Sequence, residues 1–226
     1  MAQRAQRRRN RLQVGRRALP KIDPTLDVSR HFRTVEELVD APWNPAALFG
    51  RAAPLEVEVG SGKGLFLQTA SLGTPEHDFL GIEVAYKYAR FIAHRLAKRA
   101  IPNAVAVHGD GLRLFRERIP ADSLAAVHVY FPDPWWKARH HKRRVMTEAF
   151  LADIVRTLQP GGRLHFWTDV KEYFDNTLEL IAKCTPLTGP IDVPEKAAEH
   201  DLDFRTHFER RMRMNNEPVY RSEFVK

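Results

Sequence analysis

Four acidic residues stand within or directly after four successive apolar segments. Glu58 lies in the first segment, Glu83 ends the second, and Asp110 follows the third. Asp133 follows the fourth, inside a Phe-Pro-Asp-Pro-Trp sequence. Carboxylates accept hydrogen bonds from ribose hydroxyls and from amino groups, and they attract positive charge. Acids in four such positions are hard to explain by solubility alone, so they are candidate ligand contacts.

Three glycines at alternate positions, Gly60, Gly62 and Gly64, follow the first apolar segment. Glycine lets the backbone turn tightly and approach a ligand without a Cβ in the way. The G-x-G-x-G spacing differs from the dinucleotide fingerprint, and no G-K-[ST] follows, which excludes a P-loop. Glu83 ends the next apolar segment after these glycines, where an acid can hold a ribose diol. A plain glycine-rich turn and a solvated loop acid remain open as alternatives.

The segments that must position these residues alternate between strand-like and helix-like patterns. This alternation predicts a doubly wound α/β fold, Rossmann-like, with a mostly parallel sheet covered on both faces. Ligands of such sheets bind outside the carboxyl ends of the strands. The four acids are therefore expected at one edge, where they suit a nucleoside with a positive centre, such as S-adenosylmethionine (SAM). The expected strands are 55–59, 78–83, 104–107, 124–131 and 163–167, and the expected helices are 63–70, 86–99, 111–118, 147–158 and 171–183.

A basic block follows Asp133 at the expected binding edge. Its five cations in eight positions, without an acid, favour a phosphate-binding patch over a solvated helix entrance. Trp135 and Trp136 either stack a flipped-out base or pack the end of the sheet. His140 and His141 are adjacent and lack metal-ligand spacing, so no metal is expected. The cations are Lys137, Arg139, Lys142, Arg143 and Arg144, and a second cluster, typical of a charged edge strand, stands at Arg205, Arg210, Arg211 and Arg213.

The amino-acid composition limits the classes of protein to which the chain can belong. The chain has 226 residues, of which 43% are hydrophobic and 28% are charged, enough to bury a sizeable core. No segment approaches the roughly 20 apolar residues that span a bilayer, so no membrane partner is expected. The single cysteine, Cys184, excludes an intramolecular disulfide and lies in an apolar helical register, which favours burial. A reducing cytoplasm fits this usage.

The net charge of +8 is concentrated at the N-terminus. Seven arginines stand between Arg4 and Arg17 inclusive, with no acid before Asp23, and without them the charge is +1. We expect a basic disordered arm over 1–20, an N-terminal extension packed on the core over 21–54, and the ligand-binding domain over 55–226. A mitochondrial transit peptide is the alternative, although the arm lacks the serines and most of the apolar residues of one.

Five motifs occur in order between residues 55 and 209. They are Glu58-Val59-Gly60-Ser61-Gly62-Lys63-Gly64, Gly81-Ile82-Glu83, the block from Phe131 to Arg144, Thr168-Asp169 and Thr206-His207-Phe208-Glu209. Together they resemble the bacterial tRNA (guanine-N7)-methyltransferase family. The F-P-D-P-W…K-x-R-H-x-K-R-R block is the most restrictive of them. Trp136 departs from the proline or other residue expected at its position, which affects the local turn only.

The resemblance implies a class I SAM-dependent methyltransferase that modifies N7 of a guanine in tRNA, at position 46 of the variable loop. It also implies roles for individual residues. The residues that would contact SAM are Glu58, Gly60, Gly62, Glu83, Asp110 and Asp133. The residues that would contact the substrate are Lys137, Asp169, Thr206 and Glu209. The residues that would contact the RNA are Arg139, His140, His141, Lys142, Arg143 and Arg144.

The chemistry of guanine N7 points to one of these acids as the catalytic residue. N7 carries an in-plane lone pair and needs no deprotonation before it attacks a methyl group. The enzyme must align the reacting atoms and stabilise the positive charge that moves to the purine. Asp133 is the expected catalytic residue and Asp169 the second candidate. A SAM-dependent methyltransferase of another substrate and a non-catalytic RNA-binding protein are the alternatives, and a monomer and a homodimer both stay open.

Overall fold

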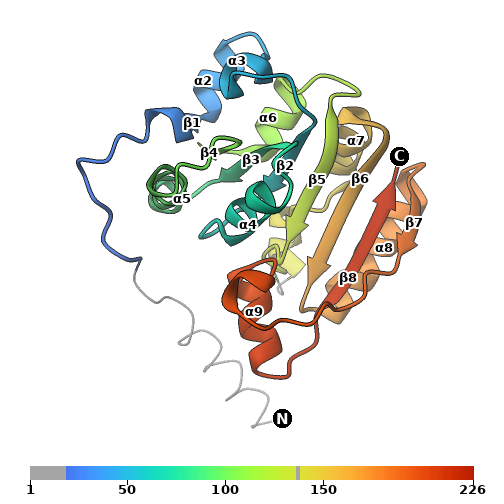
Figure 1. Cartoon of the computed structure of the whole chain (residues 1–226). Helices are drawn as coiled ribbons and strands as arrows, with labels where there is room; N and C mark the ends of the chain where they lie inside the picture. The colour runs from blue at the N-terminus through green and yellow to red at the C-terminus, as the bar shows by residue number, and fades with distance from the viewer. Residues whose placement is uncertain (1–18, 136–137) are drawn as a thin grey trace.

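The computed structural model describes residues 19–135 and 138–226 (Figure 1). The predictions for the arginine arm up to residue 18, for Trp136 and for Lys137 lie outside the described residues. Within the described ranges, no helix is both long and apolar enough to pass through a bilayer.

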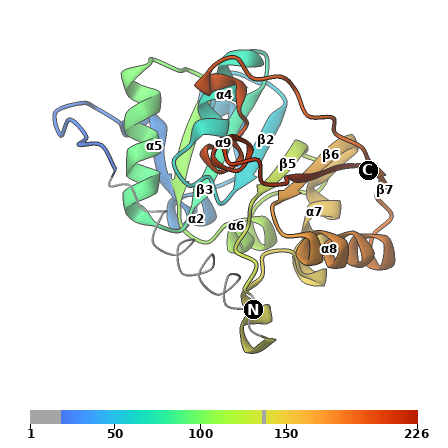
Figure 2. The same ribbon diagram turned by 90° about the horizontal axis from the view of Figure 1, so that it is seen from below.

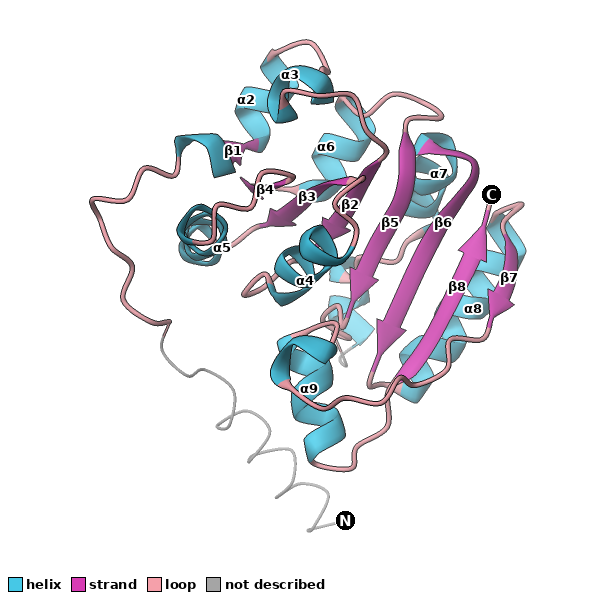
Figure 3. Cartoon of the chain, in the orientation of Figure 1, coloured by secondary structure: helices cyan, strands magenta, loops and turns pink. Residues whose placement is uncertain are grey.

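The described residues build one eight-stranded sheet. Its strands are β1 (Phe32–Thr34), β2 (Leu55–Val59), β3 (Asp78–Glu83), β4 (Ala104–His108), β5 (Leu124–Tyr130), β6 (Leu158–Thr168), β7 (Thr188–Ile191) and β8 (Tyr220–Val225). Their order is β1-β4-β3-β2-β5-β6-β8-β7 (Figure 3). Neighbours from β1 to β6 are parallel, and β8 is antiparallel to β6 and β7. The mostly parallel, doubly wound fold is confirmed, and its strand order reverses between β2 and β5.

Helices cover both faces of the sheet. Figure 2 shows α4 and α5 on one side and α6, α7 and α8 on the other. The helices are α2 (Val35–Asp40), α3 (Pro45–Phe49), α4 (Leu65–Gly73), α5 (Tyr86–Lys98), α6 (Gly111–Glu117), α7 (Glu148–Thr157), α8 (Lys171–Cys184) and α9 (His207–Met214), with 3₁₀ turns η1 (Ser29–His31), η2 (Ala138–Arg143) and η3 (Asp201–Asp203).

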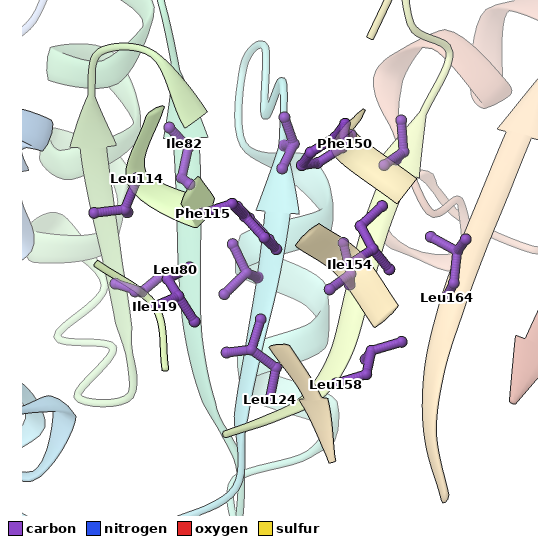
Figure 4. Close-up of a cluster of buried hydrophobic side chains, with 14 of the residues drawn as sticks. Leu80, Ile82, Leu114, Phe115, Ile119, Leu124, Phe150, Ile154, Leu158 and Leu164 are labelled. Atoms are coloured by element: carbon purple, nitrogen blue, oxygen red, sulfur yellow. The ribbon is translucent and has the colours of Figure 1, made fainter. Parts of the chain in front are cut away.

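The larger hydrophobic core lies between the sheet and α6, α7 and α8 (Figure 4). Phe115 of α6 and Phe150 of α7 meet edge-to-face there, with ring centroids 5.2 Å apart. Val57 of β2 enters the same core. Because side chains alternate along a strand, Glu56 and Glu58 face the opposite side, where α4 packs. The strand therefore carries acids on the face that leads to the glycine loop.

The N-terminal extension adds to the edge of the sheet. Strand β1 pairs in parallel with β4. A capping box then begins α2, because Thr34 Oγ1 accepts from the N–H of Glu37 at 3.2 Å and Glu37 Oε2 accepts from the N–H of Thr34 at 2.7 Å. Val35 and Val39 are buried in the larger core. Residues 28–49 thus pack against the sheet edge and α6.

Two local predictions are wrong. The second basic cluster forms no edge strand, because Thr206 caps a helix, α9, through its side chain. Cys184 is exposed, not buried. The buried stripe of α8 runs through Tyr173, Thr177 and Ile181, and Cys184 ends the helix outside that stripe.

Candidate active site

The loop after β2 is shaped by its glycines. Gly60, Gly62 and Gly64 have φ of 85°, 55° and 68°, a region that other residues rarely adopt. A Cβ built on Gly60 or Gly62 would meet no atom within 4 Å, so this side of the loop is open to a ligand. The N–H groups of Gly60 and Ser61 donate to the carbonyl of Ile82 at 2.8 and 3.1 Å. The loop is therefore tied to the end of β3.

Glu83 ends β3 and fixes the loop from the other side. Its carboxylate accepts from the N–H of Gly62 at 2.8 Å and from the N–H of Ala85 at 2.8 Å. Burial raises the pKa of Glu83 and the charge of Asp133 adds to the shift, although the two backbone hydrogen bonds oppose it. Val84, the next residue, is 74% exposed. The exposed apolar side chain of Val84, on which a base could pack, therefore lies directly beside the Glu83 carboxylate, which can accept hydrogen bonds from hydroxyl groups.

Glu58 lies at the end of β2 with only 3% of its surface exposed. Its Oε2 has no hydrogen-bond partner within the described part of the chain. Burial raises the pKa of Glu58 to about 8, and the charge of Glu83 adds to the shift, while the Ser61 side chain and Arg205 oppose it. Because an unpartnered buried carboxyl oxygen costs free energy, the position favours a ligand that donates a hydrogen bond and brings positive charge.

Asp110 follows β4 and begins α6. Its Oδ1 accepts from the N–H of Leu112 at 2.9 Å and from that of Arg113 at 3.4 Å, so Asp110 is the N-cap of this helix. The capping role explains the residue without a ligand. Its second oxygen has no recorded partner among the described residues, so the predicted adenine contact stays a prediction.

Asp133 lies exposed in the loop after β5. Phe131 and Trp135, on either side of it, have positive φ of 50° and 44°, a left-handed conformation that costs free energy in non-glycine residues. Burial is the main cause of the raised pKa of Glu83 and of Tyr173, and the charge of Asp133 adds to both shifts. Asp133 is therefore close to both side chains. The structure brings Glu58, Glu83 and Asp133 together beside the glycine loop.

Three of the four predicted substrate residues, Asp169, Thr206 and Glu209, are described and lie at the same edge. Asp169 stands between β6 and α8. Thr206 Oγ1 accepts from the N–H of Glu209 at 3.0 Å, and Glu209 Oε2 accepts from the N–H of Arg205 at 2.7 Å, which forms a capping box. Glu209 is 3% exposed and its Oε1 pairs with Arg221 at 3.1 Å. These contacts hold α9 against β8, and substrate contact by all three predicted residues stays a prediction.

The basic block forms η2, directly after the Asp133 loop. Arg144 donates from Nε to the carbonyl of Pro134 at 2.8 Å. The guanidinium of Arg143 lies 5.1 Å from the ring centre of Trp135, and His140 meets the same ring edge-on at 5.8 Å. Trp135 thus packs within its own loop, and stacking of a base on it stays a prediction. Arg139 and Arg143 are exposed, whereas Lys137 and the side chains of His141 and Lys142 lie outside the described part.

Sequence reasoning missed Arg205 as a member of this site. Its guanidinium carbon lies 5.5, 5.9 and 5.4 Å from the ring centres of Phe66, Tyr130 and Trp167. The rings come from the start of α4 and the ends of β5 and β6. Arg205 therefore reaches the edge of the sheet where the carboxyl ends of the parallel strands lie, which we call the carboxyl edge. The Thr-x-x-Glu spacing that follows Arg205 is the signal that could have placed it before a helix.

A polar network on the α4 side of the sheet was also missed. Glu56 lies 2.6 Å from His77 Nδ1 and 2.6 Å from His128 Nε2. Burial works against ionisation, but these hydrogen bonds lower the pKa of Glu56 to about 2. Burial lowers the pKa of His128 to about 3, so its neutral ring donates to Glu56 and accepts from the Tyr130 hydroxyl at 2.8 Å.

In the described ranges, no three His, Cys, Asp or Glu side chains converge to hold a metal ion.

The chain is similar to a protein family described as "Putative methyltransferase", whose model matches residues 52–222. A tRNA (guanine-N(7)-)-methyltransferase of Rhodopirellula baltica is 52% identical over 94% of this chain and 80% of that protein. The Bordetella pertussis protein of the same name is 41% identical over 75% of this chain and 66% of its own length.

Two solved structures of methyltransferases share the fold. The 16S rRNA methyltransferase KamB aligns with a TM-score of 0.60 and 15% identity, over 82% of this chain and 94% of that one. A 30S ribosomal A1408 methyltransferase from an uncultured bacterium aligns with a TM-score of 0.53 and 16% identity, over 80% of this chain and 92% of that one.

Proposed function

Since the chain belongs to the tRNA (guanine-N7)-methyltransferase family, we propose that it transfers a methyl group from SAM to N7 of a guanine in tRNA. The observation that carries this proposal is the convergence of Glu58, Glu83 and Asp133 beside an open glycine loop. The reaction takes place in the cytoplasm, and the target base lies in the variable loop at position 46, as the resemblance to the family implies.

The residues at the carboxyl edge fit the parts of SAM. Glu83 accepts from the ribose hydroxyls while its backbone hydrogen bonds keep it in place. Val84 offers an apolar contact to the adenine ring, and the second oxygen of Asp110 accepts from the adenine amino group. Glu58, buried and unpartnered at Oε2, receives the positively charged amino-acid end. When bound there, SAM supplies a methyl group attached to a positively charged sulfur.

The transfer needs alignment and charge stabilisation. The N7 lone pair forms the new nitrogen–carbon bond, the methyl–sulfur bond breaks, and sulfur keeps the bonding pair, which leaves S-adenosylhomocysteine. Positive charge moves from sulfur to the purine in this step. The carboxylate of Asp133 stabilises the growing charge and orients the base by accepting from its N1 and N2 hydrogens. Asp169, at the end of the next strand, is the second residue that can hold the base.

The basic block delivers the RNA to this edge. Arg139 and Arg143 are exposed on η2, shortly after Asp133 in the chain, so phosphates bound there lie next to the reacting base. The seven arginines from Arg4 to Arg17 add electrostatic attraction for the same polyanion.

Nucleoside analysis tests the proposal. Unmodified tRNA is incubated with the protein and methyl-labelled SAM, digested to nucleosides and separated. The expected product is labelled N7-methylguanosine, absent when the tRNA is destroyed by nuclease beforehand. Label in a small molecule or a protein would assign the enzyme another substrate. Tight tRNA binding without any methyl transfer would identify a non-catalytic RNA-binding protein. Either result would contradict the proposed function.

A further inference from the structure

Three buried polar atoms at the carboxyl ends of the strands lack hydrogen-bond partners in the described ranges. They are Glu58 Oε2, at the end of β2, Trp167 Nε1, near the end of β6, and Ser61 Oγ, in the glycine loop beside Glu58. The first is a hydrogen-bond acceptor when ionised and the second can only donate. Native structures leave few buried polar side-chain atoms unpaired. An acceptor and a donor, both unsatisfied and separated by one strand, indicate that a ligand with both kinds of group completes this part of the site.

Arg205 adds further donors close to the Trp167 ring and to Glu58. Its guanidinium lies 5.4 Å from the ring centre of Trp167 and 5.9 Å from that of Tyr130, and its charge acts on Glu58. Only the backbone N–H of Arg205 has a recorded hydrogen bond among the described residues, to Glu209. A guanidinium carries five N–H donors whose planar arrangement matches a carboxylate. The group is thus held by aromatic rings with its hydrogen-bonding capacity unused.

A second guanidinium lies over the same indole ring. Arg221 is 8% exposed at its side chain and lies 5.1 Å from the ring centre of Trp167, the same ring that Arg205 covers. Both arginines are anchored to Glu209, Arg205 through its backbone and Arg221 through an ion pair of 3.1 Å. Arg221 also pairs with Glu195 at 2.9 Å, so its charge is compensated by carboxylates, whereas the guanidinium of Arg205 over the same indole ring can attract a negative group.

The methionyl end of SAM is an α-amino acid, with an ammonium and a carboxylate on one carbon. We propose that Arg205 and Trp167 bind this carboxylate while Glu58 binds the ammonium, an assignment that rests on the function proposed above. The orphaned acceptor then receives the ammonium hydrogens, and the orphaned indole N–H and the guanidinium donate to the carboxylate oxygens. The capping box of α9 positions Arg205 for this contact, so α9 becomes part of the donor site.

The test compares SAM with decarboxylated SAM, which lacks only the carboxylate. Dissociation constants for both are measured by calorimetry on the wild-type protein and on Arg205→Gln. The wild type is expected to bind SAM about tenfold or more tighter than the decarboxylated donor, the effect of charge-assisted hydrogen bonds. Arg205→Gln is expected to lose most of this ratio, and Trp167→Phe to reduce it by a smaller factor.

Arg211→Gln is the matched control, because Arg211 lies on α9, which begins just after Arg205, and covers a different ring, that of Phe208, at 4.2 Å. It is expected to keep the wild-type ratio. Equal binding of the two donors by the wild type, or an unchanged ratio in Arg205→Gln, would overturn the proposal. Formation of N7-methylguanosine by Arg205→Gln at saturating SAM is measured separately, so that failure of the carboxylate contact is distinguished from failure of the proposed function.

Discussion

The two glutamates of β2 show how position decides the behaviour of a carboxyl group. Glu56 and Glu58 stand at alternate positions, on the same face of one strand. Glu56 receives hydrogen bonds from His77 and His128, which lower its pKa to about 2, whereas buried Glu58 has an unpartnered oxygen and a pKa raised to about 8. The sequence predicted the role of Glu58 from its place before the glycines. It could not reveal the partners of Glu56, because they come from distant segments.

Replacement of Glu58 tests its raised pKa. Because the folded pKa lies above the ordinary value of 4.5, the native state binds more protons than the unfolded state between these values. The contribution of Glu58 to the free energy of unfolding therefore falls as the pH rises from 4.5 to about 8. Glu58→Gln should raise this free energy at about pH 9, on the order of a few kcal/mol, and leave it unchanged at acidic pH.

Thermal unfolding at several pH values measures the effect, with calorimetry for SAM binding. Glu58→Gln should weaken SAM binding although it stabilises the fold. Glu56→Gln is the matched variant on the same strand, and it should destabilise the protein at neutral pH because the pKa of Glu56 is lowered. A loss of stability in Glu58→Gln at alkaline pH would contradict the assigned environment.

Asp133 carries the catalytic prediction. Asp133→Ala should lose about 10²-fold or more in turnover, the scale of a lost preorganised charged group, and Asp133→Asn should lose nearly as much because the charge is missing. The measurement is single-turnover methyl transfer to tRNA at saturating SAM. Asp122→Asn is the control, because Asp122 is exposed just before β5, at the opposite end of that strand from Asp133.

Asp169→Ala is measured beside these variants, since Asp169 is the second candidate. Wild-type turnover in Asp133→Ala and in Asp169→Ala, with both proteins folded, would remove the carboxylate from the mechanism. A loss in Asp169→Ala alone would transfer the catalytic role to the end of β6.

At the level of elements, α9 is the part that the sequence pattern described least well. Its arginines were expected in an edge strand, but Thr206 and Glu209 form a capping box and Met212 faces inward. Charge density alone does not distinguish an exposed strand from an exposed helix, whereas cap spacing does. The strand–helix alternation of residues 55–184 was predicted well, because short apolar segments alternate with amphipathic ones. The exception is the start of β6, at Leu158, because the strand includes Pro160-Gly161-Gly162, which were expected to precede it.

Glu209 should prove structural as well as functional. Glu209→Ala removes an N-terminal capping contact and leaves Arg221 buried without one of its partners. Because Arg221 keeps its ion pair with Glu195 at 2.9 Å, the loss should cost about 1 to 3 kcal/mol, so the melting temperature should fall, with a loss of SAM affinity as Arg205 is released. Thr206→Ala should cost about 1 kcal/mol. Thermal unfolding and SAM binding are measured on both, and an unchanged melting temperature in Glu209→Ala would favour a contact with substrate only.

At the level of the whole molecule, most of the net positive charge lies in the N-terminal segment and not in the α/β domain that carries the candidate site. Seven arginines lie between Arg4 and Arg17 inclusive, and the remaining chain has a formal charge of +1. Removing the segment 1–17 should weaken tRNA binding and flatten its dependence on salt, since fewer counterions are released. SAM affinity should not change, because the donor site lies at the edge of the sheet.

Binding of tRNA at several salt concentrations checks this expectation. A full-length variant with glutamine at the seven arginine positions separates the effect of charge from that of length. An unchanged salt slope in both proteins would show that the arm does not contact the RNA, and binding would then depend on the block after Asp133.

The architecture explains why distant residues form one site. Parallel strands bring their carboxyl ends to one edge, so Glu58, Glu83 and Asp133 lie along that edge although they come from segments far apart in the sequence. Their placement was predictable from strand ends alone, whereas Asp169 was named from the resemblance to the family. The contribution of Arg205 was not predictable, because Arg205 lies in the connection between β7 and α9, which carries no strand–helix pattern.

The most direct test of the account is the structure of the protein with S-adenosylhomocysteine bound. We expect the ribose on Glu83, the adenine over Val84 and the amino-acid end between Glu58 and Arg205, with the sulfur facing Asp133. A ligand bound away from the carboxyl ends of β2, β3 and β5 would contradict it.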